Sequence, residues 1–307
     1  MSIEYAILVK NKTRLETLIE RFNTRAQARF YIEHLGGDFA DYENEHNQFH
    51  QTLDQIQTQL SKTIKNKIVE RSFLPNYLFA SNQLIVVLGQ DGLVANTAKY
   101  SKGRPIVAIN PDQHRYDGIL LPFNSSNFMS GIEQVSADKF HYETMRFAKA
   151  TLNDGQYLLA FNDLFLGASS HISARYRIRY NNHAEEHSSS GLLVSTRAGS
   201  TGWLSSVFNM AYGIAGLFET NLQAKQPRLR DTDLFFTVRE PFKSIRTETT
   251  INSGFIKEQD QLVIESLMPA NGVIFSDGIE NDFLHFNSGS IARISLAEET
   301  AILVKNQ

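Results

Sequence analysis

A glycine-rich turn follows one of the most apolar runs of the chain. It reads Gly89-Gln90-Asp91-Gly92 and comes directly after Leu84–Leu88. Glycines let backbone N–H groups approach phosphate oxygens closely, and a carboxylate between them can accept a hydroxyl proton or hold a metal ion. The same residues also suit an ordinary strand-to-helix turn, in which the carboxylate caps the helix. Such turns are common, so the four residues alone favour the plain turn, and phosphate chemistry at Asp91 is the competing interpretation.

Two polar residues, Asn162 and Asp163, interrupt the apolar run Tyr157–Leu166. Buried polar atoms need hydrogen-bond partners, so such a pair inside a strand is unexpected unless it has a function. The pair can bind the hydroxyls of a ribose or an amide group. A β-bulge or a tight turn between two shorter strands explains the pattern equally well, and both interpretations stay open.

The densest group of hydroxyl side chains spans residues 195–203, where a predicted strand passes into a predicted helix. Helix N-termini bind anions and polar ligands, and Trp203, the only tryptophan, can stack on a nucleobase. The competing interpretation is a capping loop rich in Ser and Thr, with Trp203 in the core. Ser200 is predicted to cap the helix, which continues through Ile214.

Two pairs of histidines have the spacing of metal ligands. His183 and His187, with Glu186 beside the second, match the HxxEH motif of zinc peptidases, but that motif needs a helix and this segment lies between predicted strands. His46 and His50 lie four residues apart without the glutamate of the HExxH motif. We predict that both pairs are solvated surface side chains, which leaves zinc hydrolysis as a remote alternative.

The first part of the chain alternates strands with helices. Short apolar runs at Tyr5–Val9, Leu84–Leu88 and Pro105–Asn110 predict buried strands, and helical spacing predicts helices around residues 15–22 and 53–64. This alternation favours a parallel sheet covered by helices, in which ligands bind beyond the carboxyl ends of the strands.

After about residue 120 the pattern changes to many short strands separated by Asn, Asp, Gly and Ser. Few helices interrupt them, which favours an antiparallel arrangement. We predict an α/β domain with a mostly parallel sheet over residues 1–122, and a β-rich, β-sandwich-like domain over residues 123–296. A last strand within about residues 297–307 is expected to return to the first domain.

The composition limits the chemistry further. The 307 residues carry a net charge of −3, which argues against a nucleic-acid partner because phosphate backbones require clustered cations. There is no cysteine, so disulfides, thiolate metal sites and cysteine nucleophiles are excluded. No apolar run is long enough to span a bilayer, and residues 1–5 show no secretion signal. We therefore expect no membrane association and a cytoplasmic location.

Taken in order along the chain, these features resemble the NAD kinase family, and its mitochondrial-type branch with that branch's bacterial relatives in particular. Each motif is weak by itself, but together they cover nearly the whole chain in the family's order. The segments that carry the resemblance are Lys12–Arg14, Gly89–Gly92, Pro105–Asp112, Asp117-Gly118, Leu121-Pro122, Asn162-Asp163, His171–Tyr176, Ser189–Leu192, Ser200–Trp203, Val238–Pro241 and Ser276–Gly278.

The resemblance implies an NAD kinase-like fold and transfer of the γ-phosphoryl group of ATP to the 2′-hydroxyl of the adenosine ribose of NAD, which gives NADP. Asp91 would act as the general base or orienter for that hydroxyl, with Mg²⁺ or another divalent cation as helper. ATP and NAD would be the small-molecule partners. Relatives of this kind imply a homodimer or homotetramer.

The resemblance also implies which residues hold the nucleotides. Asn162 and Asp163 would bind the nicotinamide-side ribose. Arg197 stands where many relatives have proline, and we expect it to meet a phosphate. The remaining residues expected at the dinucleotide are Gly92, Thr201, Gly202, Trp203 and Ser206, and those expected at phosphates are Gly89 and Gln90.

Two positions of the turn depart from the family's pattern. Gln90 stands in place of a glycine and Leu93 in place of a threonine. These departures motivate an alternative, in which the chain is a catalytically weak or inactive regulatory protein that binds a dinucleotide. A related kinase with a lipid or sugar acceptor is a further alternative.

Overall fold

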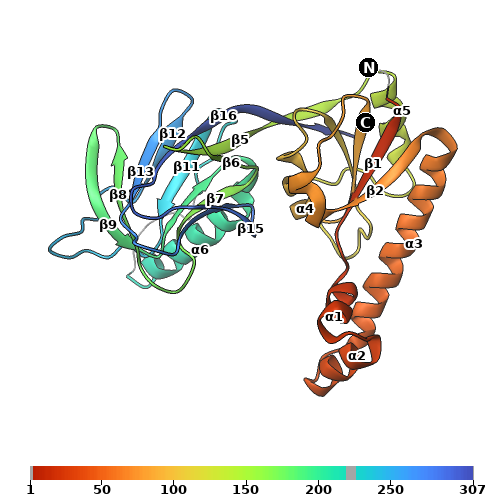
Figure 1. Cartoon of the computed structure of the whole chain (residues 1–307), viewed down its shortest axis with the longest axis horizontal. Coiled ribbons are helices and arrows are strands. Elements are labelled where there is room, and N and C mark those ends of the chain that lie inside the picture. The colour runs from red at the N-terminus through yellow and green to blue at the C-terminus, as the bar shows by residue number, and fades with distance from the viewer. Residues whose placement is uncertain (1–2, 219–225, 307) are drawn as a thin grey trace. The chain divides into compact units, whose positions relative to one another are not determined.

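The computed structural model describes residues 3–218 and 226–306 (Figure 1). The chain divides into two compact units. The first contains residues 1–144 and 301–307, and the second contains residues 145–300. No helix among the described residues has both the length and the apolar character needed to cross a membrane.

A parallel sheet forms the centre of the first unit. Its strand order is β2-β1-β3-β4-β16, where β16 contributes only its final residues. Neighbouring strands are in parallel register throughout, as in the pairs of Val9 with Val87 and of Ile302 with Pro105. The prediction of a mostly parallel sheet is confirmed. The strands are β1 (Tyr5–Lys10), β2 (Lys65–Glu70), β3 (Gln83–Leu88), β4 (Pro105–Ile109) and β16 (Ile291–Val304).

The first unit also contains helices with clear sequence signals. Thr13 caps α1 through a reciprocal pair of hydrogen bonds with Glu16, the arrangement known as a capping box. In Figure 1, α1 and α2 gather at one end of the long helix α3, and Leu15, Ala28 and Phe39 form their shared core. The helices are α1 (Arg14–Phe22), α2 (Arg25–His34), α3 (Phe39–Thr63), η1 (Arg71–Asn76), α4 (Asp91–Ala98) and α5 (Phe128–Ser136).

The buried face of α5 explains where the first unit ends. Phe128, Ile132 and Val135 are buried in the same cluster as Val107 of β4 and Phe123. Removal of these apolar side chains from water is worth roughly 1.5–3 kcal/mol each. The first unit therefore extends to residue 144, beyond the boundary that the sequence suggested at residue 122.

Two antiparallel sheets build the second unit. One sheet has the strand order β12-β11-β10-β7-β14-β15. The other has the order β9-β8-β13-β16, where β16 contributes its first residues; β5 also pairs with β16, and β6 pairs with β5. The strands are β5 (Tyr142–Leu152), β6 (Tyr157–Ala160), β7 (Asp163–Ala168), β8 (Ala174–Tyr180), β9 (His183–Ser189), β10 (Leu192–Ser195), β11 (Asp233–Val238), β12 (Ser253–Lys257), β13 (Leu262–Ser266), β14 (Gly272–Ser276) and β15 (Ile279–His285).

One apolar core lies between these sheets. Leu164 and Leu166 of β7 share it with Ile178 of β8 and Ile264 of β13. The opposite face of the first sheet carries helix α6 (Trp203–Gly216), whose Leu204 is fully buried. The predicted β-rich, sandwich-like part is confirmed. Strand β7 is buried on both faces, and on the side away from the core its Phe165 stacks against Trp203 of α6 and Phe275 of β14.

Candidate functional site

The Asp91 turn joins the central strand β3 to the helix α4. Gln90 is the N-cap residue, and Asp91 is the first residue of the helix. The carboxylate oxygen Oδ1 of Asp91 accepts the backbone N–H of Leu120 at 2.7 Å. The turn therefore combines a carboxylate with the free N–H groups of a helix N-terminus, at the carboxyl end of a parallel strand, where anionic ligands bind well.

The two glycines of this turn have different surroundings. A Cβ atom on Gly89 would lie 2.8 Å from Cδ2 of Leu93, so the buried Leu93 side chain occupies the space above this glycine. Around Gly92, by contrast, no heavy atom lies within 4 Å of an added Cβ among the described residues. Packing explains Gly89, whereas the open space beside Gly92 suits the close approach of a ligand.

Gln90 adopts φ −99° and ψ 167°, an extended conformation that any residue takes without strain. Its side chain is hydrogen-bonded to the hydroxyl of Tyr116, which also donates to Glu45 at 3.4 Å. Burial raises the pKa of Tyr116, and the contact with Gln90 partly offsets that effect. Gln90, which stands in place of the family's glycine, therefore fits here: its backbone is unstrained, and its side chain has a partner in Tyr116.

The Asn162-Asp163 pair lies at the break between β6 and β7, so the predicted single strand is two strands joined by a tight turn. Asp277 holds this turn. Its carboxylate accepts the backbone N–H groups of Phe161 at 3.0 Å, of Asn162 at 2.6 Å and of Asp163 at 3.2 Å. In return, the N–H of Asp277 donates to the carbonyl oxygen of Asp163 at 3.0 Å.

The structure brings part of the hydroxyl cluster against the same turn. Thr196 donates its N–H to the carbonyl oxygen of Asn162 at 2.9 Å and its hydroxyl to that of Phe161 at 2.5 Å. A Cβ atom on Gly199 would lie 2.3 Å from the carbonyl oxygen of Asn162. Since backbone atoms cannot move aside, only glycine fits at position 199. The Asn162-Asp163 turn and the hydroxyl-rich segment are therefore joined by hydrogen bonds and close packing, although they are distant in the sequence.

The side chain of Asp163 is buried beside Asp277 and Ser195. Burial raises the pKa of this carboxyl to about 7, the hydrogen bond with Ser195 opposes the rise, and the charge of Asp277 adds to it. Its oxygen Oδ1 has no hydrogen-bond partner within the described part of the chain. A buried acceptor without a donor is costly, and a ligand hydroxyl would satisfy it.

The residues predicted at the adenosine half follow this turn. Thr201 ends the short 3₁₀ helix η2 (Ala198–Thr201), Gly202 is the N-cap of α6, and Ser206 is an exposed residue of that helix. The prediction that Ser200 caps α6 is wrong, because the 3₁₀ turn directs its hydroxyl to the carbonyl oxygen of Arg197 at 2.7 Å.

Arg197, predicted to meet a phosphate, forms an ion pair within the second unit. Its Nε lies 2.6 Å from Oδ1 of Asp231, and a terminal nitrogen contacts the sulfur of Met145 at 3.4 Å. A phosphate would therefore compete with the Asp231 carboxylate for this guanidinium group.

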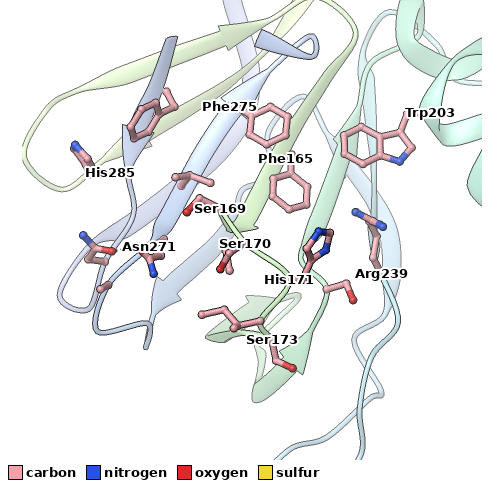
Figure 2. A pocket seen from close by; sticks show the side chains of 18 residues that line it. Phe165, Ser169, Ser170, His171, Ser173, Trp203, Arg239, Asn271, Phe275 and His285 are labelled. Atoms are coloured by element: carbon pink, nitrogen blue, oxygen red, sulfur yellow. Dashed lines mark hydrogen bonds between the residues drawn. The ribbon is translucent and has the colours of Figure 1, made fainter. Parts of the chain in front are cut away.

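A pocket of about 1030 Å³ lies in the second unit, beside the start of α6 (Figure 2). Trp203 and Phe165 are almost parallel, with ring centroids 5.7 Å apart and an interplanar angle of 12°, and Phe275 continues the stack at 4.8 Å from Phe165. The guanidinium carbon of Arg239 lies 5.4 Å from the centre of the Trp203 ring. This combination suits a flat aromatic group joined to an anion.

Polar side chains complete the pocket. Among them Figure 2 labels His171, Asn271 and His285. They lie between β7 and β8, between β13 and β14, and at the end of β15. Of the predicted site residues, only Trp203 lines this pocket. The aromatic partners Phe165 and Phe275 carried no functional signal because they resemble any inward-facing residue of a strand.

The prediction of a solvated surface holds for His183, which is exposed on β9, but not for the other three histidines. His187 lies on strand β9, where a zinc-peptidase motif cannot form, and it is buried, with Nε2 2.6 Å from a carboxylate oxygen of Glu185. His46 and His50 lie on α3 and are half-buried against the start of α1. His187, His46 and His50 are covered because the strand and the helix each turn one face inward.

Comparison with solved structures identifies the fold. No protein-family model matches the sequence, and the search of curated proteins gives no match either. Yeast NADH kinase in complex with NADH is similar over 100% of this chain and 84% of its own length, with a TM-score of 0.59 and 13% identity. An NAD kinase from Archaeoglobus fulgidus in complex with ATP is similar over 98% of this chain and 94% of its own, with a TM-score of 0.53 and 16% identity. The chain therefore has the fold of the NAD kinases, as the resemblance of its motifs predicted.

Proposed function

We propose that this protein transfers the γ-phosphoryl group of ATP to the 2′-hydroxyl of the adenosine ribose of NAD and so forms NADP. The observation that carries the proposal is the position of Asp91. This carboxylate begins helix α4 directly beyond the central parallel strand, in a chain with the NAD kinase fold. The two solved relatives were crystallised with NADH and with ATP, which supports a nucleotide as ligand.

Asp91 is the proposed base or orienter for the acceptor hydroxyl. Its Oδ1 is held by the N–H of Leu120, and no hydrogen-bond donor within the described residues reaches Oδ2, so this oxygen can accept a proton. Mg²⁺ is normally held by one or two carboxylates together with substrate phosphates, and Asp91 is the carboxylate of this turn that fits that role. The cation would neutralise charge on the phosphates during transfer.

The second unit supplies the proposed dinucleotide contacts. The unpaired, buried Oδ1 of Asp163 is a suitable acceptor for a ribose hydroxyl, beside Asn162 in the turn that Asp277 holds. Thr201, Gly202 and Ser206 are the further proposed contacts around the start of α6. Trp203 is the proposed stacking partner of the adenine ring, as its place in an aromatic pocket supports.

The decisive experiment incubates the pure protein with NAD, ATP and Mg²⁺ and measures NADP. We expect NADP from the wild type and its loss in Asp91→Asn, because the amide cannot accept a proton although its oxygen can still accept the Leu120 N–H. Asp54→Asn, a change at an exposed carboxylate of α3, is the matched control and should keep full activity. An active Asp91→Asn variant would refute the assigned role.

The regulatory alternative gives a different result in the same assay. A protein that binds NAD but forms no NADP would be a dinucleotide-binding protein rather than a kinase. Gln90→Gly then tests whether the side chain at position 90 causes the inactivity. Because Gln90 contacts Tyr116 without backbone strain, we expect this variant to change turnover little.

A further inference from the structure

Three potential metal ligands meet where α1 packs on α3, in the first unit. Glu16 comes from the first turn of α1, and His46 and His50 come from successive turns of α3. One donor atom from each residue lies within 4.8 Å of the other two. We propose that Glu16, His46 and His50 bind a divalent transition-metal ion, with Zn²⁺ as the best-fitting candidate.

The geometry of the three side chains is close to that of a bound site. Residues four apart share one face of a helix, and the two imidazole rings have centroids 4.3 Å apart. The carboxylate oxygen Oε1 of Glu16 is 3.1 Å from Nε2 of His50. Ligands of a tetrahedral zinc ion lie about 3.3 Å from one another, since each bond is about 2.0–2.1 Å long. Rotation of the side chains alone can therefore close the site.

The surroundings also prepare the ligands. The Thr13 hydroxyl lies 2.9 Å from Nδ1 of His46 and so supports the orientation of the ring. Burial, and then the charge of His50, lowers the pKa of His46, which favours the neutral imidazole that metals require. Burial opposes ionisation of Glu16, but contacts with Thr13, Lys10 and His50 outweigh it and lower its pKa.

The types of the ligand atoms decide which metal the site accepts, because the nearby cations oppose every divalent ion alike. The ammonium group of Lys10 lies 3.9 Å from Oε1 of Glu16, and Arg25 is close enough to disfavour positive charge on His46. A hard cation such as Mg²⁺ would find a single carboxylate here beside a positive charge. Zn²⁺ gains strong bonds from two imidazoles, so a set of two histidines and one glutamate selects it over Mg²⁺ or Ca²⁺.

A bound ion would join segments that are about thirty residues apart in the sequence. The link includes Glu16 of the capping box, whose other carboxylate oxygen accepts the Thr13 N–H, and the ion pairs of Arg14 with Asp41 and Glu45 join the same two helices. Three protein ligands leave the fourth position to water or to another donor. The site would thus clamp α1 to α3, a role that is independent of phosphoryl transfer.

The experiment titrates the metal-free, full-length protein with ZnCl₂ in a calorimeter and repeats the thermal unfolding with and without zinc. We expect one ion per chain and a rise in the unfolding temperature, because a ligand that binds only the folded state stabilises it. His46→Ala and His50→Ala should each weaken binding by about 10-fold or more, since even supporting residues of metal sites contribute that much. His114→Ala, at an exposed histidine, is the control and should bind as the wild type does.

A second measurement needs no variant. Cobalt(II) added to the wild-type protein should give the intense visible absorption of a four- or five-coordinate ion with nitrogen ligands, and one equivalent of Zn²⁺ should remove it. The proposal fails if the wild type binds no stoichiometric ion, if His46→Ala and His50→Ala bind zinc as well as the wild type, or if the cobalt spectrum is that of the hydrated ion.

Discussion

The carboxylate of Asp277 accepts the backbone N–H of Asn162 at 2.6 Å, although 115 positions separate the two residues. Asp277 lies in the turn between β14 and β15, and Asn162 lies in the turn between β6 and β7. The same carboxylate also accepts the N–H groups of Phe161 and Asp163. The predicted Asn-Asp pair therefore owes its conformation to a residue whose positioning role the sequence did not indicate.

Removal of this carboxylate should destabilise the second unit. Asp277→Ala leaves three backbone N–H groups without their acceptor, and we expect the free energy of unfolding to fall by about 3 kcal/mol. Asp277→Asn keeps one acceptor oxygen and should lose only about half as much. Urea denaturation measures both values. A loss below about 0.5 kcal/mol in Asp277→Ala, which is typical of an ordinary surface change, would contradict the assignment.

The buried carboxyl of Asp163 should make stability depend on pH. Its pKa is about 7 in the folded protein and 3.8 in an unperturbed chain, so the folded state binds the proton more tightly between these values. Stability is therefore highest below about pH 4 as far as this group is concerned, and falls as pH rises toward 7.

Asp163→Asn removes this dependence because the amide stays neutral. Its gain in unfolding free energy over the wild type should grow from pH 5 to pH 8, up to a limit of the order of 4 kcal/mol. Thermal or urea unfolding at both pH values gives the comparison. Equal differences between variant and wild type at pH 5 and pH 8 would show that the carboxyl does not titrate in this range.

Gly92 offers a test that separates function from stability. No atom of the described structure obstructs a methyl group at this helical position, so Gly92→Ala should raise the free energy of unfolding by about 0.5 kcal/mol. If the glycine exists to admit a phosphate, the same variant should raise the KM for nucleotide. Gly213→Ala, at an equally open position in α6, is the matched control and should leave the KM unchanged. An unchanged KM in Gly92→Ala would show that the nucleotide does not approach the backbone at Gly92.

Trp203 provides an internal probe of nucleotide binding, because it is the only tryptophan and it lines the pocket. NAD should change its fluorescence in a saturable titration. Arg239→Met keeps much of the apolar stem and removes the cation, so it should weaken binding of ADP by about 10-fold and leave adenosine unaffected. The absence of any fluorescence change at saturating NAD would exclude Trp203 as the adenine contact.

Local features of the sequence predicted a large part of the fold. Helical spacing of apolar residues predicted a helix around residues 15–22, and α1 spans Arg14–Phe22. The apolar runs that became β3 and β4 are buried strands, and Asp91 lies directly beyond β3, at the start of α4. These predictions succeed because spacing, capping and turn chemistry depend on neighbours along the chain.

The remaining features depend on contacts between distant segments. The two predicted strands that end at Leu296 and Val304 are one continuous strand, β16. Its first residues pair with β13 and its last residues pair with β4, and the sequence does not reveal these distant partners. Likewise, Phe165 joins Trp203 and Phe275 in one stack only when β7, α6 and β14 come together.

The sequence by itself determined the fold class, the order of the motifs and the place of Asp91 after a buried strand. Only the tertiary structure decided that Asp277 holds the Asn162-Asp163 turn and that Glu16 meets His46 and His50. The physical reason is that hydrogen bonds and burial act through space. A pattern of residues records which groups are available, whereas the packing of helices and strands determines which of them meet.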